Sequence, residues 1–455
     1  MTVLGSAALV VLLLSSPASA FVVEHRLGRV PFTAPATSLR ATDGPAEGFQ
    51  RAAAGFLAAA ALWSSPSLLS SLPVADFTGS AGGTAYAKEM ASGSGSRVNK
   101  DAESLLRYGL PITNKEVRKL QLPLEAIRQD IVSKRTGDAL NDSKISRGIL
   151  KSKSAEMIKS CVDPKACADI IAKMSDDMTP LDEALDEAKN FQLGSQQQGA
   201  ALDKAAAAQT VLSKQLTTLE EGMVPKGYRT PVPEVYKDLP QLQGRATVEF
   251  VIKKTDGAPF DIQGVNFPEA RLKMVIDGYN APVTAGNFVD LVLKNFYTEM
   301  NIQRSDGFVV QTGDPKGEAD GYVGTPSKSI GQGRHGERLI PLEIFVKGDK
   351  GPFYETTIED DGRGGEATTL PFSSYGVMGW AREEYDPNSG SSQFFWLLFD
   401  SDLTPAGKNV LDGRYPVFGY VVEGADYLAD VKEGDVIVSA KVLQGAENLL
   451  QPSGP

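Results

Sequence analysis

The stretch that decides the fold is NIQRSDGFVVQTGD, residues 301–314. Its second half, FVVQ (308–311), has the aromatic and β-branched content of a short strand. Arg304 stands four residues ahead of Phe308, so the stretch predicts a guanidinium held beside an apolar strand. A cation placed next to a core-forming strand indicates a site, or an ion pair at the end of a strand.

Outward from this stretch, from Arg245 onward, apolar residues recur at every second position. RATVEFVIKK (245–254) alternates in this way, which is typical of a strand with one buried face. PVTAGNFVDLVLKNFY (282–297) has helical spacing instead, and a second helix is expected near residues 425–431. Many short strands with two helices predict a closed antiparallel β-barrel capped by helices over residues 245–445.

The preceding part of the chain has a different period. Residues 97–222 carry apolar positions at helical spacing, which predicts an antiparallel helical bundle, with Thr179 capping and Pro180 opening one of its helices. Residues 223–244 contain four prolines without periodicity and are expected to form a linker pinned to a domain surface by Tyr228 and Tyr236. The predicted fold class is therefore α+β with two domains.

The first 87 residues are typical of targeting segments. An apolar run at 3–14 ends in SSPASA followed by Phe21, and a second run at 52–63 leads to Ala85-Tyr86-Ala87. Both runs are short for a membrane span. Two export signals in series predict delivery across two kinds of membrane, which resembles import into a plastid followed by transfer into the thylakoid lumen. A single arginine before the second run leaves the export route open.

Composition excludes several kinds of function. The formal net charge of −11 argues against nucleic acid and anionic lipid as partners, and no stable membrane insertion is expected of the mature chain. Only two histidines occur, and His25 lies in the targeting region, so a multi-histidine metal site is excluded. We expect no cofactor and no metal. The GQGRHG sequence at 331–336 matches a dinucleotide fingerprint in letters only, because no strand precedes it and no helix follows it.

Two cysteines, Cys161 and Cys167, stand in CVDPKAC. Their spacing does not fit a zinc site. Asp163 and Pro164 are typical of a helix start, so the cysteines are expected to flank a corner between helices. At such a corner a disulfide and two free structural thiols are both consistent with the sequence.

Five segments, taken in order, resemble the cyclophilin family of peptidyl-prolyl cis-trans isomerases. They are NAPVTAGNFVDLV (280–292), IQRSDGFVVQTGD (302–314), YGVMGWA (375–381), SGSSQFFW (389–396) and NVLDGRYPVFGYV (409–421). Together with the helical region, the chain is similar to the multidomain cyclophilins of the thylakoid lumen, which take part in photosystem II assembly. The resemblance implies a capped closed barrel and X–Pro-containing polypeptides as substrates, here lumenal loops of photosystem II proteins. It also implies an intramolecular contact between bundle and barrel.

The resemblance assigns site residues one by one. It implies catalytic roles for four residues, Arg304 as the donor to the prolyl nitrogen and with it Phe308, Gln311 and Phe395. It implies substrate binding by Met378, Gly379, Trp380, Ala381, Gln393, Leu411 and Tyr415. Without the motif order, Phe308, Met378 and Phe395 would fit a barrel core and Arg304 would fit a strand-end ion pair.

Several positions depart from the family pattern. Gln303 and Tyr415 stand where histidines are usual, Val410 replaces a tryptophan, and Trp380 follows Gly379 at the groove. One residue is missing between Arg304 and Phe308. We therefore expect a weak isomerase acting in folding or assembly of thylakoid complexes. The alternative is a peptide-binding assembly chaperone that does not catalyse, or one whose groove is covered by its own bundle or linker.

Overall fold

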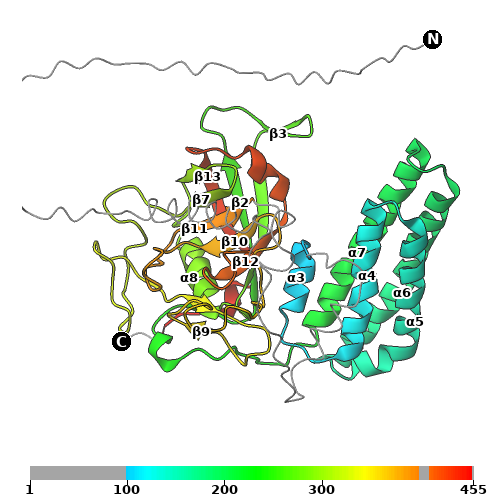
Figure 1. Cartoon of the computed structure of the whole chain (residues 1–455), viewed down its shortest axis with the longest axis horizontal. Coiled ribbons are helices and arrows are strands. Elements are labelled where there is room, and N and C mark those ends of the chain that lie inside the picture. The colour runs from blue at the N-terminus through cyan, green and yellow to red at the C-terminus, as the bar shows by residue number, and fades with distance from the viewer. Residues whose placement is uncertain (1–98, 399–408, 453–455) are drawn as a thin grey trace, which may run out of the picture. The chain divides into compact units, whose positions relative to one another are not determined.

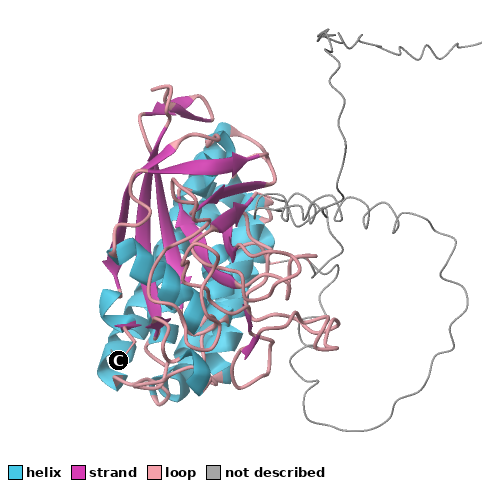
Figure 2. Ribbon diagram, turned by 90° about the vertical axis from the view of Figure 1, so that its left-hand side faces the viewer, coloured by secondary structure: helices cyan, strands magenta, loops and turns pink. Residues whose placement is uncertain are grey.

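The computed structural model describes residues 99–398 and 409–452 of the chain (Figure 1). The predicted targeting segments, residues 1–87, lie outside the described residues, as do the first two positions of the predicted bundle. Helices make up the first part of the described chain and strands dominate the rest, which confirms the predicted α+β fold class (Figure 2).

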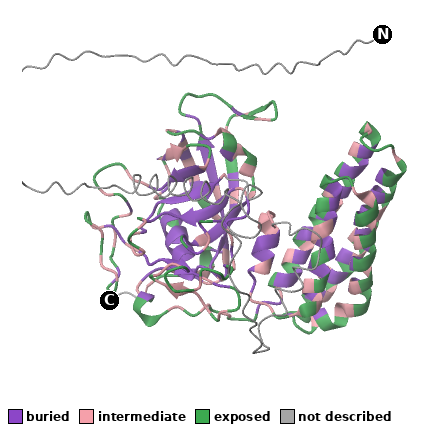
Figure 3. Cartoon of the chain, viewed as in Figure 1, coloured by how far each residue is buried: buried purple, intermediate pink, exposed green. Residues whose placement is uncertain are grey.

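Four long helices form the bundle, and consecutive ones pack on each other. They are α4 (Lys115–Val132), α5 (Thr136–Ile158), α6 (Pro164–Asn190) and α7 (Gln196–Glu221). Asn114, Asp163 and Ser195 cap α4, α6 and α7 by accepting backbone N–H groups of the first turn. Each helix buries one face in a shared apolar core and exposes the other, as Figure 3 shows. Periodic apolar positions thus account for the bundle.

A disulfide joins Cys161 to Cys167 at the corner between α5 and α6. Both residues are buried in the bundle core. The backbone N–H of Val162 donates to the carbonyl O of Gly222, 2.9 Å away, just past the end of α7. The bonded pair therefore fixes the corner beneath the point where the chain leaves the bundle.

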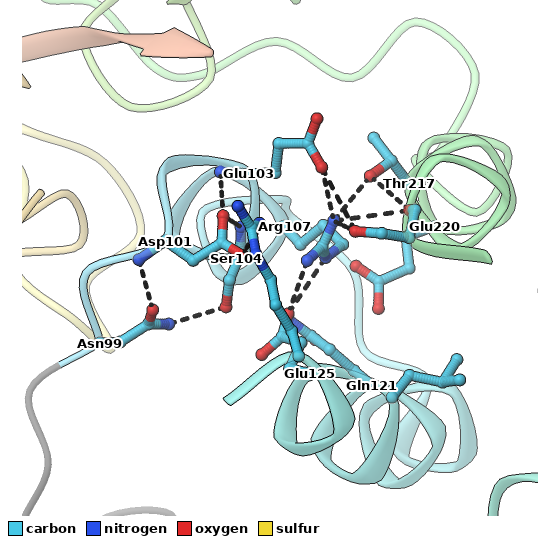
Figure 4. Close-up of polar contacts among 12 residues, drawn as sticks. Asn99, Asp101, Glu103, Ser104, Arg107, Gln121, Glu125, Thr217 and Glu220 are labelled. Atoms are coloured by element: carbon cyan, nitrogen blue, oxygen red, sulfur yellow. Dashed lines mark hydrogen bonds and ion pairs between the residues drawn. The ribbon is translucent and has the colours of Figure 1, made fainter. Parts of the chain in front are cut away.

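A short helix, α3 (Ala102–Tyr108), precedes the bundle and is tied to it by polar contacts (Figure 4). The Arg107 guanidinium is 1% exposed. It donates to Glu125 of α4 at 3.0 and 3.1 Å, and to the hydroxyls of Ser213 and Thr217 of α7 at 3.0 Å each. A buried guanidinium needs this number of acceptors, because an unpaired buried charge is strongly destabilising.

Helix α3 also contacts residues of the strand region. Leu105 and Leu106 belong to the same apolar cluster as Phe395 and Tyr420. The carbonyl O of Leu106 accepts from Arg245, and that of Gly109 accepts from Asn280 Nδ2 at 2.9 Å. The seven residues of α3, about two turns of helix, thus contact both the bundle and the strand region.

The proline-rich segment after α7 follows the surface of the strand region. It contains one 3-10 turn, η1 (Glu234–Tyr236). Tyr236 is buried, with its ring centroid 4.9 Å from that of Tyr354, and the Tyr228 ring lies 6.0 Å from Tyr279. The two tyrosines expected to pin this segment both make ring contacts.

Eight strands close an antiparallel barrel in the order β10-β11-β7-β6-β13-β2-β5-β12 (Figure 1). Their bounds are β2 (Arg245–Lys253), β5 (Ala270–Asp277), β6 (Met300–Ser305), β7 (Val309–Thr312), β10 (Val377–Trp380), β11 (Phe394–Leu397), β12 (Val417–Glu423) and β13 (Val436–Gln444). Three two-stranded pairs lie outside the barrel, namely β1 (Gln241–Leu242) with β14 (Leu449–Leu450), β3 (Phe260–Ile262) with β4 (Val265–Phe267), and β8 (Glu343–Ile344) with β9 (Phe353–Tyr354).

Helix α8 (Pro282–Leu293) covers one end of the barrel and is buried along almost its whole length. Its Phe288 ring lies 5.2 Å from the rings of both Phe394 and Phe418 inside the barrel. The second predicted capping helix is a 3-10 helix, η3 (Ala425–Asp430), and η4 (Ala446–Asn448) follows β13. None of the helices in the described ranges combines the length and apolar composition needed to cross a bilayer.

Candidate functional site on the outer face of the barrel

Four of the residues singled out in the sequence lie in one row across four adjacent strands. Arg304 on β6 pairs with Gln311 on β7, Gln311 pairs with Phe395 on β11, and Phe395 pairs with Gly379 on β10. Directly opposed residues of neighbouring strands project from the same face of a sheet. Sheet pairing therefore brings the guanidinium, the amide and the aromatic ring onto one face of the barrel.

The polar part of the row is a chain of amide hydrogen bonds. Gln311 is 4% exposed and its Nε2 donates to Gln393 Oε1 at 2.9 Å. Gln393 Nε2 donates in turn to the carbonyl O of Asp320 at 2.7 Å, and its own carbonyl O accepts from Ala381 N at 3.0 Å. Within the described ranges, the Gln311 Oε1 atom is buried without a hydrogen-bond partner.

The apolar part of the site centres on Phe395. This fully buried ring stacks on Phe372 at 5.9 Å and meets Tyr415 edge-on at 6.0 Å. One apolar cluster contains Phe395, Ala381, Leu411 and Tyr415, with Phe308 half-buried against it. The structure thus brings these predicted residues together beside Arg304.

Tyr415 occupies one of the positions that depart from the family pattern. Its ring is 4% exposed and lies between Phe395 and the Arg382 guanidinium, whose Cζ is 5.0 Å from the ring centroid. Burial raises the pKa of Tyr415 above its ordinary value. The side chain therefore stays neutral at physiological pH and contributes an apolar wall.

Two predicted binding residues lie elsewhere. Met378 and Trp380 flank Gly379 on β10, and successive side chains of a strand point to opposite faces. Both belong to the apolar cluster inside the barrel, where the Trp380 ring is 5.4 Å from Phe418. Their position does not fit the substrate-binding roles that the resemblance implied, and they act as barrel core.

Sequence reasoning missed Val309 and Phe372. Val309 is buried in the cluster that holds Phe395 and Leu411, and Phe372 supplies the stacking ring. The signal for Val309 was available, because it stands two residues before Gln311 on β7 and therefore shares its face of the sheet. Phe372 comes from the long connection before β10, and no spacing rule links such a loop to the site.

A further missed residue is Asp306, which contacts Arg304 directly. Arg304 Nε donates to Asp306 Oδ2 at 2.8 Å, and Nη2 donates to the same oxygen. Burial acts to raise the pKa of Asp306, but hydrogen bonds from Val309 N and from Arg304 outweigh it and hold that pKa below its ordinary value. The carboxylate is therefore ionised throughout the physiological range.

A second carboxylate near the site behaves in the opposite way. Gln303 Nε2 donates to the carbonyl O of Asp314 at 2.8 Å, at the end of β7. Burial, together with the charge of Asp320, raises the pKa of Asp314 to about 6. No group of histidine, cysteine or acidic side chains suited to a metal ion occurs in residues 99–398 and 409–452.

Comparisons with known proteins identify the family to which this chain belongs. The model of the cyclophilin-type peptidyl-prolyl cis-trans isomerases matches residues 261–446, and the model of the PsbQ-like domain of CYP38-like isomerases matches residues 101–224. The chain is 42% identical over 359 residues to the chloroplastic peptidyl-prolyl cis-trans isomerase CYP38 of Arabidopsis thaliana, covering 78% of this chain and 76% of the relative. The chain belongs to the cyclophilin family.

Two other relatives add detail. A putative thylakoid lumen peptidyl-prolyl cis-trans isomerase of Synechocystis is 40% identical over 77% of this cyclophilin and 84% of its own length. The chloroplastic isomerase CYP37 of Arabidopsis thaliana is 34% identical over 49% of this chain and 44% of its own. These relatives confirm the predicted location of this cyclophilin, the thylakoid lumen of a plastid. As a cyclophilin, it acts on proline-containing polypeptides.

Proposed function

We propose that this cyclophilin accelerates cis–trans isomerisation of X–Pro bonds in polypeptides of the thylakoid lumen. The single observation that supports this most strongly is the row of Arg304, Gln311, Phe395 and Gly379 across β6, β7, β11 and β10. It sets a permanent cation, an amide and an aromatic wall side by side on one face.

The chemistry needs no covalent step. Rotation about the X–Pro bond breaks amide resonance, which gives a barrier of about 18–20 kcal/mol. A donor aimed at the prolyl nitrogen stabilises its lone pair in the twisted state and so lowers the barrier, because only interactions stronger in the transition state accelerate a reaction. Arg304, which is always charged and planar, is suited to that role.

The remaining residues would hold the peptide. The half-buried Phe308 would contact the prolyl ring, supported from beneath by the buried Phe395, Leu411 and Val309. Gln311, which pairs with Arg304 across β6 and β7, would orient the guanidinium. Gly379 leaves room for the stacked rings of Phe395 and Phe372 on the groove face. Gln393 and Ala381 fix the edge of the groove through their backbone hydrogen bond.

The proposed clients are lumenal loops of photosystem II proteins. The description of the helical domain as PsbQ-like supports a client of this kind. We also propose the domain division predicted from the sequence, with a bundle at 97–222, a linker at 223–244 and a cyclophilin domain at 245–445. The α4–α7 bundle and the β2–β13 barrel support it, and the β1–β14 pair extends the second domain slightly at both ends.

A separate observation favours a second function. Arg304 is engaged in an ion pair with Asp306, which favours a groove that binds peptides while catalysing weakly or not at all. Such a protein would be a peptide-binding assembly chaperone. The two functions share the groove and differ only in whether Arg304 reaches the prolyl nitrogen.

The test compares two arginine variants of the mature chain, residues 88–455. Exchange between cis and trans resonances of a proline peptide is measured by NMR, with peptide binding followed in the same samples. Arg304→Ala should reduce the catalysed rate on the order of a hundredfold with little loss of binding. The control, Arg271→Ala, removes an arginine of β5 whose side chain is 58% exposed and should change neither. Equal rates in both variants would overturn the isomerase.

A further inference from the structure

The turn between β6 and β7 is organised by a single carboxylate, that of Asp306. Its Oδ1 accepts the backbone N–H groups of Phe308 and Val309, each at 3.0 Å. Its Oδ2 accepts Nε and Nη2 of Arg304. One side chain therefore links the proposed prolyl donor to the start of the strand that supplies the apolar surface.

This link follows from the short turn. Only Ser305, Asp306 and Gly307 separate Arg304 from Phe308, and Gly307 takes a left-handed φ of 78° that a glycine adopts at no cost. Asp306 is the first residue of the turn, directly after β6 ends at Ser305, and from there its carboxylate reaches the Arg304 guanidinium. The carboxylate thus meets the guanidinium on the groove face.

The ion pair is partly shielded from water. The Arg304 side chain is 16% exposed and that of Asp306 is 40% exposed. Water and salt screen such a pair less than a fully exposed one. A carboxylate in contact with the guanidinium opposes its positive potential and engages two of its five N–H donors.

We propose that Asp306 is a positioning residue that holds Arg304 in an ion pair and so limits the charge and the donors that Arg304 presents to a prolyl nitrogen. This inference rests on the proposed isomerase function and deepens it. In this account the barrel carries a complete isomerase site whose activity is set by the Arg304–Asp306 pair. Removing the carboxylate charge should raise the rate.

The decisive variant is Asp306→Asn. Its side-chain oxygen can still accept from Phe308 N and Val309 N, so the turn is kept, while its NH2 group faces the guanidinium and cannot pair with it. The matched control is Asp261→Asn. Asp261 is exposed, and its Oδ1 likewise accepts a backbone N–H within a turn, that of Gly264 at 2.7 Å, on the β3–β4 hairpin away from the row.

The experiment measures kcat and KM for cis–trans exchange of a proline peptide by NMR, with the mature chain (residues 88–455) in five forms. These are the original sequence, Asp306→Asn, Asp261→Asn, Arg304→Ala, and Arg304→Ala with Asp306→Asn. Asp306→Asn should raise kcat by roughly fivefold, the size expected for releasing a partly exposed ion pair. Asp261→Asn should leave kcat unchanged, and the double variant should show no gain over Arg304→Ala.

The outcomes separate this inference from the function on which it rests. Arg304-dependent exchange that Asp306→Asn leaves unchanged or lowers would overturn the inference and keep the isomerase. Exchange that appears only in Asp306→Asn, and is lost when Arg304 is also replaced, would support both. Binding without exchange in every form would overturn both, because the released arginine then does not catalyse.

Discussion

Gly379 lies opposite Phe395 in the pairing of β10 with β11, and a Cβ atom at position 379 would lie 2.3 Å from Cζ of the Phe395 ring. The same Cβ would lie 2.8 Å from the Phe372 ring. No real Cβ approaches an aromatic carbon so closely, so the glycine is what allows the two stacked rings to occupy the groove face. The stacked rings of Phe395 and Phe372 therefore require a glycine at position 379.

Replacing Gly379 by alanine should therefore displace Phe395. Overpacking of this kind costs about 1–3 kcal/mol, and the displaced ring should weaken binding of a proline peptide. Urea unfolding and a peptide titration measure the two effects. The control is Gly365→Ala, since a Cβ there would meet no atom within 4 Å and Gly365 lacks a left-handed φ. Equal behaviour of the two variants would contradict the packing described for Phe395.

The buried carboxyl of Glu220 in the bundle leads to a prediction of how stability depends on pH. Glu220 of α7 is fully buried, with Oε2 accepting from Arg118 Nη1 at 3.1 Å, and no hydrogen-bond partner for Oε1 occurs in the part of the chain that the structure describes. Burial, only partly offset by Arg118 and Arg107, raises the pKa of Glu220 to about 8 from 4.5 (Figure 4). Between these two pH values the folded state binds a proton that the unfolded state has lost.

Stability should therefore fall as pH rises through this window. The contribution of Glu220 is fully present below about pH 4.5 and is lost as pH rises to about 8, by a few kcal/mol in total. Glu220→Gln cannot titrate, so its unfolding free energy should change less over the same range. Urea unfolding at pH 5 and pH 8 measures the difference. A steeper fall in the variant than in the original chain would show that Glu220 is not protonated in the folded state.

The disulfide gives a prediction specific to the bundle. Replacing both Cys161 and Cys167 by alanine opens a short loop and should lower the unfolding free energy by about 2 kcal/mol. A reductant should shift the urea midpoint of the original chain towards that of the variant and leave the variant unchanged. If the reductant shifts neither, the two sulfurs are not bonded in solution.

The sequence predicted the two architectures because each depends on a simple period. Val117, Leu120, Leu124 and Ile127 follow helical spacing, and all are buried in the bundle core. The alternation from Ala246 to Ile252 likewise corresponds to the inward face of β2. One boundary was wrong, because α6 continues through Thr179 and Pro180 where a new helix was expected. Pro180 is exposed there, so its ring leaves the apolar face of Met178 and Leu181 undisturbed.

The site was predicted in part. Motif order located Arg304, Gln311 and Phe395, whose neighbourhood depends on local strand pairing. Motif order does not predict which side chains of β10 point into the barrel. Val377, Met378, Gly379 and Trp380 are all buried, so their burial does not alternate along the strand. Met378 and Trp380 were therefore expected at the groove, whereas both belong to the cluster inside the barrel. The Arg304–Asp306 pair depends on the exact length of one turn, which a motif does not specify.

In the proposed mechanism, Arg304 acts through its planar, multidentate guanidinium on the prolyl nitrogen. The most direct measurement is the NMR exchange rate of a proline peptide with the mature chain and with Arg304→Lys, which keeps the charge and loses the planar fork. We expect catalysed exchange by the original chain and a rate at least about tenfold lower for Arg304→Lys, with similar peptide binding. Equal exchange rates for the two chains, or no exchange by the original chain while the peptide binds, would contradict it.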